Sequence, residues 1–223
     1  MPQDPGAPSL HPRLVLASAS PRRSALLADL DLDFTIRPPQ TDETPLPYES
    51  PADLVARLAR EKAQARVGAG EIVLAADTVV VIDNEILGKP ADATEARSML
   101  ARLSGRDHEV YTGVALADGS SGRGGSGASS GSRVPTRLAS RVERTQVRIR
   151  EMSAAEIAAY VAGGEPMDKA GSYAIQGWGA LFVEAIAGNY TNVVGLPMPA
   201  VEACFRELGF ELASFRRKPS GSG

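Results

Sequence analysis

The apolar run from Glu71 to Ile82 constrains the fold of this chain more than any other stretch. Its hydrophobic residues follow one another almost without interruption, which is typical of a central β-strand covered on both faces. Asp77 interrupts the run, and Thr78 follows it. A carboxylate inside such a strand is costly to bury unless it pairs with a cation, holds a metal ion or lies where the strand opens into a cleft. We therefore expect a ligand site at Asp77, and a structural aspartate that caps neighbouring backbone is the alternative.

A second constrained stretch covers residues 14–27. It predicts a short buried strand that breaks at Ser18 and continues as a helix with Ser20 as its N-cap and a proline in its first turn. Arg22 and Arg23 follow the proline. Hydroxyl and guanidinium groups at the positive end of a helix dipole suit a phosphate or another polyanion. The alternative is an ordinary N-cap with two solvated surface arginines.

Hydrophobic periodicity predicts the remaining elements and indicates the α/β class. A Ser-Ala-Ala-Glu capping box begins the third of the longer predicted helices. These longer helices are expected over residues 51–67, 93–103, 153–161 and 199–208, and strands over residues 14–17, 33–37, 109–117, 138–150, 181–186 and 210–215.

The glycine-rich segment of residues 165–179 predicts a loop whose backbone can approach a ligand closely. It contains Asp168 and Lys169, which we assign to substrate binding. The amide of Gln176 can both donate to and accept from the edge of a nucleobase. The aromatic residues of this segment, such as Tyr173, suit either stacking on a base or burial in the core.

Two lysines and an acidic pair are candidates whose role depends on their surroundings. Lys62 extends the apolar face of a predicted helix, so it either carries its ammonium out to solvent or points into a pocket that requires a cation. Lys89 lies beside a rigid turn and, taken alone, is an exposed loop lysine. Glu43 and Asp42 lie in the proline-rich connector of residues 38–51, where most acidic pairs are solvated.

Composition excludes several classes of site and partner. The net charge of −3, with dispersed Lys and Arg, argues against binding to nucleic acid. One cysteine, Cys204, excludes an internal disulfide and a multi-cysteine zinc site, and only two histidines, His11 and His108, argue against a histidine-ligated transition metal. We expect any metal to be a hard cation held by carboxylates and substrate oxygens. No apolar run approaches the length of a membrane span, and the first dozen residues, rich in Pro and Gly, lack the apolar centre of a signal peptide, so a cytoplasmic protein is expected.

The chain of 223 residues is expected to form one folded domain with unstructured ends. Residues 1–12 are predicted to be a disordered leader, residues 13–215 the domain, and residues 216–223 a tail. Residues 119–132 are dominated by Gly and Ser and predict a flexible loop between two strands. A phosphate-binding P-loop is not expected there, because these glycines are not followed by Lys and Ser or Thr at a helix start.

Six ordered motifs resemble those of the Maf family. The resemblance runs from about residue 13 to residue 215 and so covers nearly the whole predicted domain. It implies an elongated α/β fold with a mixed sheet and two lobes around a central cleft, similar to the inosine-triphosphate pyrophosphatases. The motifs are Leu-Ala-Ser-Ala-Ser-Pro-Arg-Arg at 16–23, Ala-Arg-Glu-Lys-Ala at 59–63, Ala-Asp-Thr-Val-Val at 76–80, Gly-Lys-Pro at 88–90, Asp-Lys-Ala-Gly-Ser-Tyr-Ala-Ile-Gln-Gly at 168–177 and Asn-Val-Val-Gly-Leu-Pro at 192–197.

The resemblance also implies an activity and a set of site residues. Maf proteins are known as nucleoside triphosphate pyrophosphatases, which use a divalent cation to release pyrophosphate, and they commonly form homodimers. Asp77 matches the position assigned as proton acceptor, and Glu43 matches an acidic partner near the metal. The positions that contact the triphosphate match Ser18, Arg23, Lys62 and Lys89.

Three further positions are associated in the family with the choice of base. They match Arg22, Thr78 and Gln176, which are the residues of the branch that prefers dTTP and UTP. The branch that prefers 7-methyl-GTP typically has an aromatic residue, Gln and Glu at these positions. The resemblance therefore implies a dTTP/UTP pyrophosphatase.

The residues and the resemblance together predict hydrolysis of dTTP and UTP, with modified pyrimidine nucleotides as further candidate substrates. Asp77 orients or deprotonates the attacking water and, with Glu43, holds Mg²⁺ or Mn²⁺ in this hypothesis. Arg23, Lys62 and Lys89 offset the charge on the departing pyrophosphate. The alternative is a nucleotide-binding regulator of cell division, as the family's older septum-inhibitor name suggests. The presence of Asp77, Lys62 and Lys89 favours the enzyme.

Overall fold

The described residues of the computed structural model, 12–65, 67–119 and 137–217, form one sheet of seven strands. The strands are β1 (Arg13–Leu16), β2 (Phe34–Ile36), β3 (Glu71–Ile82), β4 (Glu85–Leu87), β5 (Asp107–Asp118), β6 (Arg137–Ile149) and β7 (Val183–Ala187). Their order is β2-β1-β3-β5-β6-β7, and β4 pairs with β3. β1 is parallel to β2 and β3, whereas the pairs from β3 to β7 are antiparallel. The prediction of an α/β fold with a mixed sheet is confirmed.

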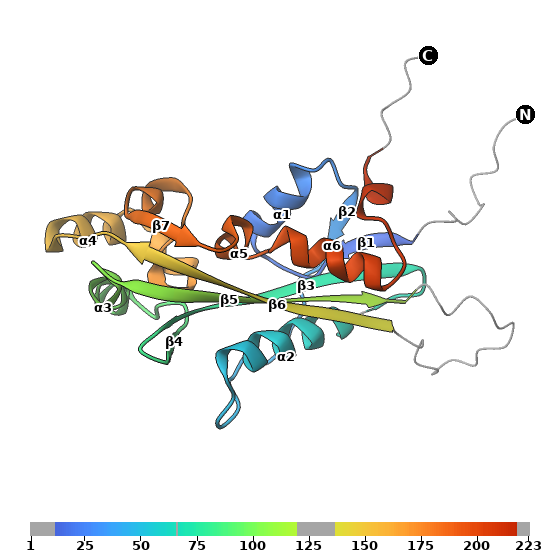
Figure 1. Ribbon diagram of the computed structural model, residues 1–223, viewed down its shortest axis with the longest axis horizontal. Helices are drawn as coiled ribbons and strands as arrows, with labels where there is room; N and C mark the ends of the chain where they lie inside the picture. The colour runs from blue at the N-terminus through green and yellow to red at the C-terminus, as the bar shows by residue number, and fades with distance from the viewer. Residues whose placement is uncertain (1–11, 66, 120–136, 218–223) are drawn as a thin grey trace, which may run out of the picture.

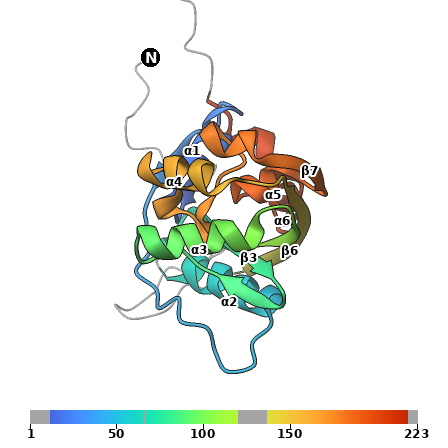
Figure 2. The same cartoon turned by 90° about the vertical axis from the view of Figure 1, so that its left-hand side faces the viewer.

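Helices cover both faces of this sheet. The α-helices are α1 (Pro21–Ala28), α2 (Pro51–Gln64), α3 (Ala93–Leu103), α4 (Ala154–Ala162), α5 (Tyr190–Val194) and α6 (Met198–Glu207), and the 3₁₀ helices are η2 (Glu165–Asp168), η3 (Ala170–Ser172), η4 (Gly177–Leu181) and η5 (Leu212–Phe215). α2 and α6 lie on opposite faces of the sheet, as Figures 1 and 2 show. Among the described residues, no helix combines the length and apolar character that a membrane span requires.

β3 is the central strand that the sequence predicts. All of its residues are buried except Thr78, which is partly exposed. Leu74 packs in an apolar cluster with α6, whereas Val73 and Ala75 face the other way and pack with Ala59 of α2. The continuous apolar pattern therefore has its predicted cause, because both faces of β3 are covered.

The core is divided into two parts along the sheet. One apolar cluster joins β1, α1 and α6 around Phe205, and another joins α3 and α4 around Tyr160. β3 contributes Leu74 to the first cluster and Val80 to the second. Because β3 and β5 run through both parts, the molecule is elongated, as Figure 1 shows. The predicted two-lobed shape is confirmed, and Asp77 lies on β3 between the two clusters.

A glycine on β5 brings α2 close to the sheet beside Asp77. Gly113 pairs with Asp77 across β3 and β5. A Cβ atom at Gly113 would lie 2.1 Å from the carbonyl oxygen of Val55 in α2. Any larger residue at this position would push α2 away from the sheet, so Gly113 is needed for the close approach.

The segment of residues 165–179 differs from the predicted plain loop. It contains the three short 3₁₀ helices η2, η3 and η4. Gly171, Ser172 and Gly177 have φ values of 67°, 60° and 65°, so the backbone can turn sharply between one helix and the next. Sequence patterns with period 2 or 3.6 do not detect such short turns, and the glycines were the available signal.

Residues 210–215 do not form the predicted edge strand. They continue instead into η5, and the ring of Phe215 packs edge to face on Phe205 with centroids 5.3 Å apart. Phe210 also packs against this cluster. Packing of these two aromatic rings against the core takes the place of strand pairing.

The predicted leader, Gly/Ser loop and tail fall almost entirely outside the described residues. Within the predicted tail, Arg216 and Arg217 are described. Arg216 forms an ion pair of 3.1 Å with Asp31, and the Arg217 N–H donates to the Asp31 carbonyl. Residues 216 and 217 are therefore tied to the turn that follows α1.

His108 on β5 forms a buried polar pair with Tyr173. The His108 Nε2 and Tyr173 hydroxyl share a hydrogen bond of 2.7 Å, and the rings meet edge to face. His108 is only 3% exposed, and its Nδ1 has no hydrogen-bond partner in the described part of the chain. Burial lowers the pKa of His108 from 6.5 to about 4.

We expect His108 to make the stability of the protein depend on pH above the range in which carboxylates titrate. Its pKa is lower in the folded state than in the unfolded state, so the unfolded state binds more protons between these values and stability falls as the pH falls. The loss attributable to this group is about 2 kcal/mol between pH 7.5 and pH 5. Urea unfolding of wild type and His108→Gln should show a flatter pH dependence in the variant, and equal slopes would contradict this account.

Candidate functional site

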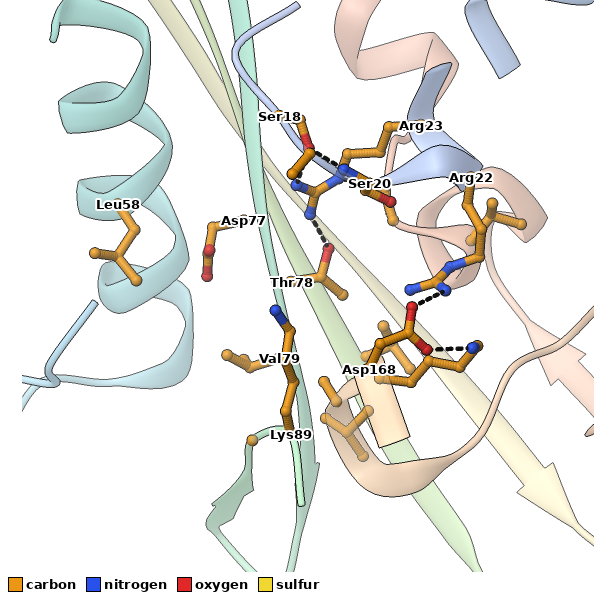
Figure 3. A pocket seen from close by; sticks show the side chains of 18 of the residues that line it. Ser18, Ser20, Arg22, Arg23, Leu58, Asp77, Thr78, Val79, Lys89 and Asp168 are labelled. Atoms are coloured by element: carbon orange, nitrogen blue, oxygen red, sulfur yellow. Dashed lines mark hydrogen bonds and ion pairs between the residues drawn. The ribbon is translucent and has the colours of Figure 1, made fainter. Parts of the chain in front are cut away.

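A cavity of about 710 Å³ opens between α1, α2, β3 and the segment that carries η2 and η3 (Figure 3). It is the predicted cleft between the two lobes. All of the site residues that the sequence predicts line its wall, and their individual roles stay predictions. They are Ser18, Ser20, Arg22, Arg23, Glu43, Lys62, Asp77, Thr78, Lys89, Asp168, Lys169 and Gln176.

Lys62, near the end of α2, holds two carboxylates together. Its Nζ lies 2.6 Å from Asp77 Oδ1 and 2.6 Å from Glu43 Oε1. Lys62 is 7% exposed and Asp77 is 8% exposed. The second alternative for Lys62 is the one observed, because its ammonium points into the cavity and does not extend to solvent. Asp77 is paired with a cation, as the cost of burying a carboxylate requires.

Glu43 joins this pair from the proline-rich connector. Its side chain is 57% exposed, so it lies at the open side of the cavity. Partial burial opposes its ionisation, but the hydrogen bond and charge of Lys62, with the charges of Lys89 and Arg23, hold the pKa of Glu43 below its usual value. Glu43 is therefore an ionised carboxylate beside Asp77 at neutral pH.

Arg23 on α1 is bound to the protein on several sides. Its Nε donates to the Gly195 carbonyl at 2.7 Å, and its Nη1 donates to Ser18 Oγ at 3.1 Å and to the Ala76 carbonyl at 2.8 Å. Its Nη2 donates to Thr78 Oγ1 at 3.1 Å. A guanidinium has five N–H donors, and four of these bonds are made within the protein. Arg23 therefore ties the turn after β1 to β3 and to the end of α5.

Burial lowers the pKa of Arg23, and the negative charge of Asp77 acts in the opposite direction. The guanidinium stays charged at neutral pH because its ordinary pKa is far higher. It therefore contributes positive charge to the cavity even though most of its hydrogen bonds are internal.

Arg22 has far fewer contacts than its neighbour. Its Nη1 lies 3.4 Å from Asp168 Oδ2, and its side chain is 27% exposed. Asp168 also binds Lys169 Nζ at 2.5 Å (Figure 3). Burial opposes the ionisation of Asp168, but Lys169 and Arg22 outweigh it and lower its pKa. Arg22 thus faces the cavity from α1 and meets η2 across it.

Thr78 lies in a chain of buried hydrogen bonds that sequence reasoning missed. Its Oγ1 shares a hydrogen bond of 2.9 Å with Thr112 Oγ1, and Thr112 Oγ1 donates to the Asn192 carbonyl at 3.1 Å. The Asn192 side chain donates to the Val110 carbonyl and to Thr145 Oγ1. Thr112, Thr145 and Asn192 are fully buried. The sequence signal that could have predicted this network is the pair of threonines at buried positions of two predicted strands.

Three polar side chains in the wall have no hydrogen bond to the described residues. Two of them, the Lys89 ammonium and the Gln176 amide, can therefore bind a ligand without breaking an internal hydrogen bond. The charge of Lys89 still acts on Glu43. Ser20 occupies the predicted N-cap position of α1, but its side chain makes no capping bond. The predicted cap is therefore wrong in its hydrogen bonding, because the turn is held by Ser18 Oγ, which accepts from the Ser20 N–H at 3.2 Å.

Comparison with known proteins identifies the family. A protein-family model, described as Maf-like protein, matches residues 13–208. The chain belongs to the Maf family. Its similarity to the dTTP/UTP pyrophosphatase of Anaeromyxobacter dehalogenans (strain 2CP-C) is 50% identity over 201 residues, covering 90% of this chain and 96% of the relative.

Two further relatives with the same name support this assignment. The dTTP/UTP pyrophosphatase of Myxococcus xanthus (strain DK1622) is 49% identical over 89% of this chain and 94% of its own. That of Symbiobacterium thermophilum is 45% identical over 90% of this chain and 96% of its own. The resemblance to the Maf family found in the sequence is confirmed over nearly the whole domain.

The central position of Lys62 gives a testable energetic consequence. Lys62→Met leaves Asp77 and Glu43 close together without a cation, so we expect a loss of about 3 kcal/mol in the free energy of unfolding. In the Asp77→Asn background the same substitution should cost clearly less, because one buried charge has already been removed. Lys89→Met is the matched control, since Lys89 makes no ion pair with the described residues. Equal losses in Lys62→Met and Lys89→Met would contradict the proposed pairing energy.

Proposed function

We propose that this protein is a nucleoside triphosphate pyrophosphatase that hydrolyses dTTP and UTP to the monophosphate and pyrophosphate. Relatives of 45% to 50% identity that are named dTTP/UTP pyrophosphatase support this substrate class. The observation that carries the proposal is the Lys62 ammonium bound to Asp77 and Glu43 in the wall of the cavity. A positioned carboxylate can act as a general base, and a fixed cation beside it can stabilise charge that develops on phosphate.

Asp77 is the group that activates water in this proposal. Its carboxylate orients a water molecule and accepts a proton as the water oxygen bonds to the α-phosphorus. The bond between the α-phosphorus and the oxygen that bridges to the β-phosphorus then breaks, and pyrophosphate leaves. Lys62 donates a hydrogen bond of 2.6 Å to Asp77 and so holds the carboxylate in place.

The positive groups of the cavity bind the triphosphate. Lys89 has no ion pair with the described residues, so its ammonium is available to phosphate oxygens without breaking an internal contact. Ser18 and Ser20 lie in the turn before α1 and line the same cavity. Arg23 adds positive charge from behind this turn and has one N–H left for a phosphate oxygen. Charge that develops on the departing pyrophosphate is stabilised by these fixed groups.

The carboxylates of Asp77 and Glu43 also fit a divalent cation such as Mg²⁺ or Mn²⁺. Both carboxylates contact one cationic atom, Lys62 Nζ, so the two side chains together already bind a positive charge. Within the described ranges no three His, Cys, Asp or Glu side chains form a metal-binding group, so phosphate oxygens and water would supply the other ligands, as is common for Mg²⁺. When bound, such a cation supplies neutralisation of phosphate charge.

Arg22, Thr78 and Gln176 select the base in this proposal. Thymine and uracil present two carbonyl oxygens and one N–H, which match guanidinium, hydroxyl and amide groups. Thr78 is fixed by Arg23 and Thr112, whereas Arg22 and Gln176 keep free donors toward the cavity. Asp168 and Lys169 line the same side and act through Arg22 or the sugar and phosphates.

We also propose a homodimer that works in the cytoplasm, where nucleoside triphosphates are made and used. Trp178 and Leu181 on η4 are 72% and 60% exposed and offer apolar surface for a second copy. Light scattering distinguishes a dimer from a monomer of 23.4 kDa.

Purified protein with dTTP and Mg²⁺ should yield dTMP and pyrophosphate in equal amounts. Asp77→Asn should lower kcat by at least about a hundredfold, because the amide cannot accept the proton of the attacking water. The products are separated by ion-exchange chromatography. Release of single orthophosphate, or a loss of less than about tenfold in Asp77→Asn, would contradict the mechanism. Tight binding of dTTP without hydrolysis would indicate the nucleotide-binding regulator instead.

Substitution of Arg22 should change the choice of base, whereas Arg23 is assigned to phosphate. Arg22→Ala should lower the ratio of kcat/KM for dTTP over dCTP by about tenfold, because a donor to the base is lost. Arg22→Lys keeps the charge but not the planar fork, so it should recover only part of the ratio. An equal decrease in kcat/KM for dTTP, dCTP and dGTP would identify Arg22 as a phosphate ligand and contradict this assignment.

A further inference from the structure

A short piece of chain that carries Gln176 is held at both ends by two residues outside the cavity wall. Tyr160 on α4 accepts a hydrogen bond of 3.3 Å from the Ala174 N–H at the beginning of this piece. The Tyr160 hydroxyl donates in turn to Glu165 Oε1 at 2.8 Å. Neither Tyr160 nor Glu165 lines the cavity, whereas Ala174 and Gln176 do.

Glu165 holds the other end of the piece. Its Oε2 accepts from the Trp178 N–H at 3.0 Å, and its Oε1 accepts from the Gly179 N–H at 3.0 Å. These are the free N–H groups of the first turn of η4, so the carboxylate acts as the cap that Gln176, at the N-cap position, does not supply. One carboxylate and one hydroxyl thus bind the backbone on both sides of Gln176.

Two glycines of this piece pack too closely on their neighbours to carry a side chain. A Cβ at Gly177 would lie 2.7 Å from Glu165 Oε2. A Cβ at Gly179 would lie 2.2 Å from the Ala174 carbonyl oxygen and 2.6 Å from the Tyr160 hydroxyl. The two glycines therefore allow residues 174–179 to fold back on themselves around the Tyr160 and Glu165 side chains.

The electrostatics of Glu165 agree with this role. Burial opposes its ionisation, but hydrogen bonds from Tyr160 and from the Gly179 and Trp178 N–H groups lower its pKa below the usual value. It is thus a charged acceptor at neutral pH, and bonds to charged acceptors are stronger than neutral ones. Tyr160 is 6% exposed, and its ring packs on Phe182 with centroids 5.1 Å apart.

Gln176 depends on this arrangement because its own side chain makes no hydrogen bond to the described residues. Its position is determined by the backbone on either side of it. Displacement of a recognition group by about 1 Å costs up to a hundredfold in rate, even when the cause is remote from the chemistry. A substitution at Glu165 or Tyr160 should therefore change how well the enzyme distinguishes one base from another.

We propose that Tyr160 and Glu165 are positioning residues that set base selectivity by holding residues 174–179, and with them Gln176, against the cavity. This inference rests on the proposed function and adds to it two residues that touch neither base nor phosphate. The nucleotide class concerned is the pyrimidine triphosphates, which differ in the donors and acceptors at the edge that a glutamine amide reads.

The test compares kcat/KM for dTTP and dCTP in Tyr160→Phe and Glu165→Gln. Tyr160→Phe removes only the hydroxyl and keeps the ring against Phe182. Glu165→Gln keeps one carbonyl acceptor but removes the charge. We expect the dTTP to dCTP ratio to fall by about tenfold in each variant, with kcat for dTTP falling less than the ratio, because Asp77 and Lys62 are untouched.

A double-mutant cycle with Gln176→Ala distinguishes positioning from general loosening. If Glu165 acts through Gln176, Glu165→Gln should not lower the ratio further in the Gln176→Ala background. Glu156→Gln is the matched control, since Glu156 on the same helix caps the N-terminus of α4 and binds Ser153 and Arg150, away from the cavity wall. It should lower the melting temperature and leave the ratio unchanged.

The possible results separate this inference from the proposed function. If wild type hydrolyses dTTP and neither Tyr160→Phe nor Glu165→Gln changes the ratio, the inference is overturned and the proposed function stands. An equal change in Glu156→Gln, or full additivity with Gln176→Ala, also overturns it. If wild type does not hydrolyse dTTP, the proposed function fails and takes the inference with it. Should Glu165→Gln fail to fold, Tyr160→Phe decides alone.

Discussion

The ion pair between Lys62 and Asp77 is the interaction on which the rest of this structure depends. Asp77 lies in the middle of a strand whose two faces are covered, where an unpaired carboxylate would cost several kcal/mol. α2 brings the Lys62 ammonium to it, and α2 reaches that position because Gly113 offers no side chain to keep it away. The need to pair one carboxylate therefore fixes how a helix lies on the sheet and where the cavity opens.

The two neighbouring arginines illustrate how adjacent residues of the same type come to differ. Arg23 makes four hydrogen bonds to the protein, so displacing it would break the link between β1, β3 and α5. Arg22 has one ion pair, at 3.4 Å, with an Asp168 side chain that is 61% exposed. Exposed pairs of this kind contribute little to stability. A ligand can replace that contact at small cost, which makes Arg22 the more adaptable of the two.

Much of the fold and the membership of the site followed from the sequence, because they depend on local patterns. The continuous apolar run predicted β3. The motifs predicted the polar side chains that we assign to the cavity, except Glu43, which lies in the proline-rich connector. What failed has no local pattern. Residues 210–215 do not form a strand, because the Phe215 ring packs on Phe205 and the Phe210 ring packs on Phe215, which is a tertiary effect. The inward direction of Lys62 depends on Asp77 and Glu43, which are distant in sequence.

The base side and the phosphate side of the cavity are built in different ways, and this has a consequence for specificity. Lys62 and Asp77 belong to a long helix and a central strand, which are held by the core. Gln176 belongs to a piece of chain without regular pairing, held by Glu165 and Tyr160. A segment held by a few polar contacts can be reshaped by few substitutions, whereas moving Asp77 would require the sheet to be repacked. The arrangement therefore allows the choice of base to vary while the catalytic groups stay fixed.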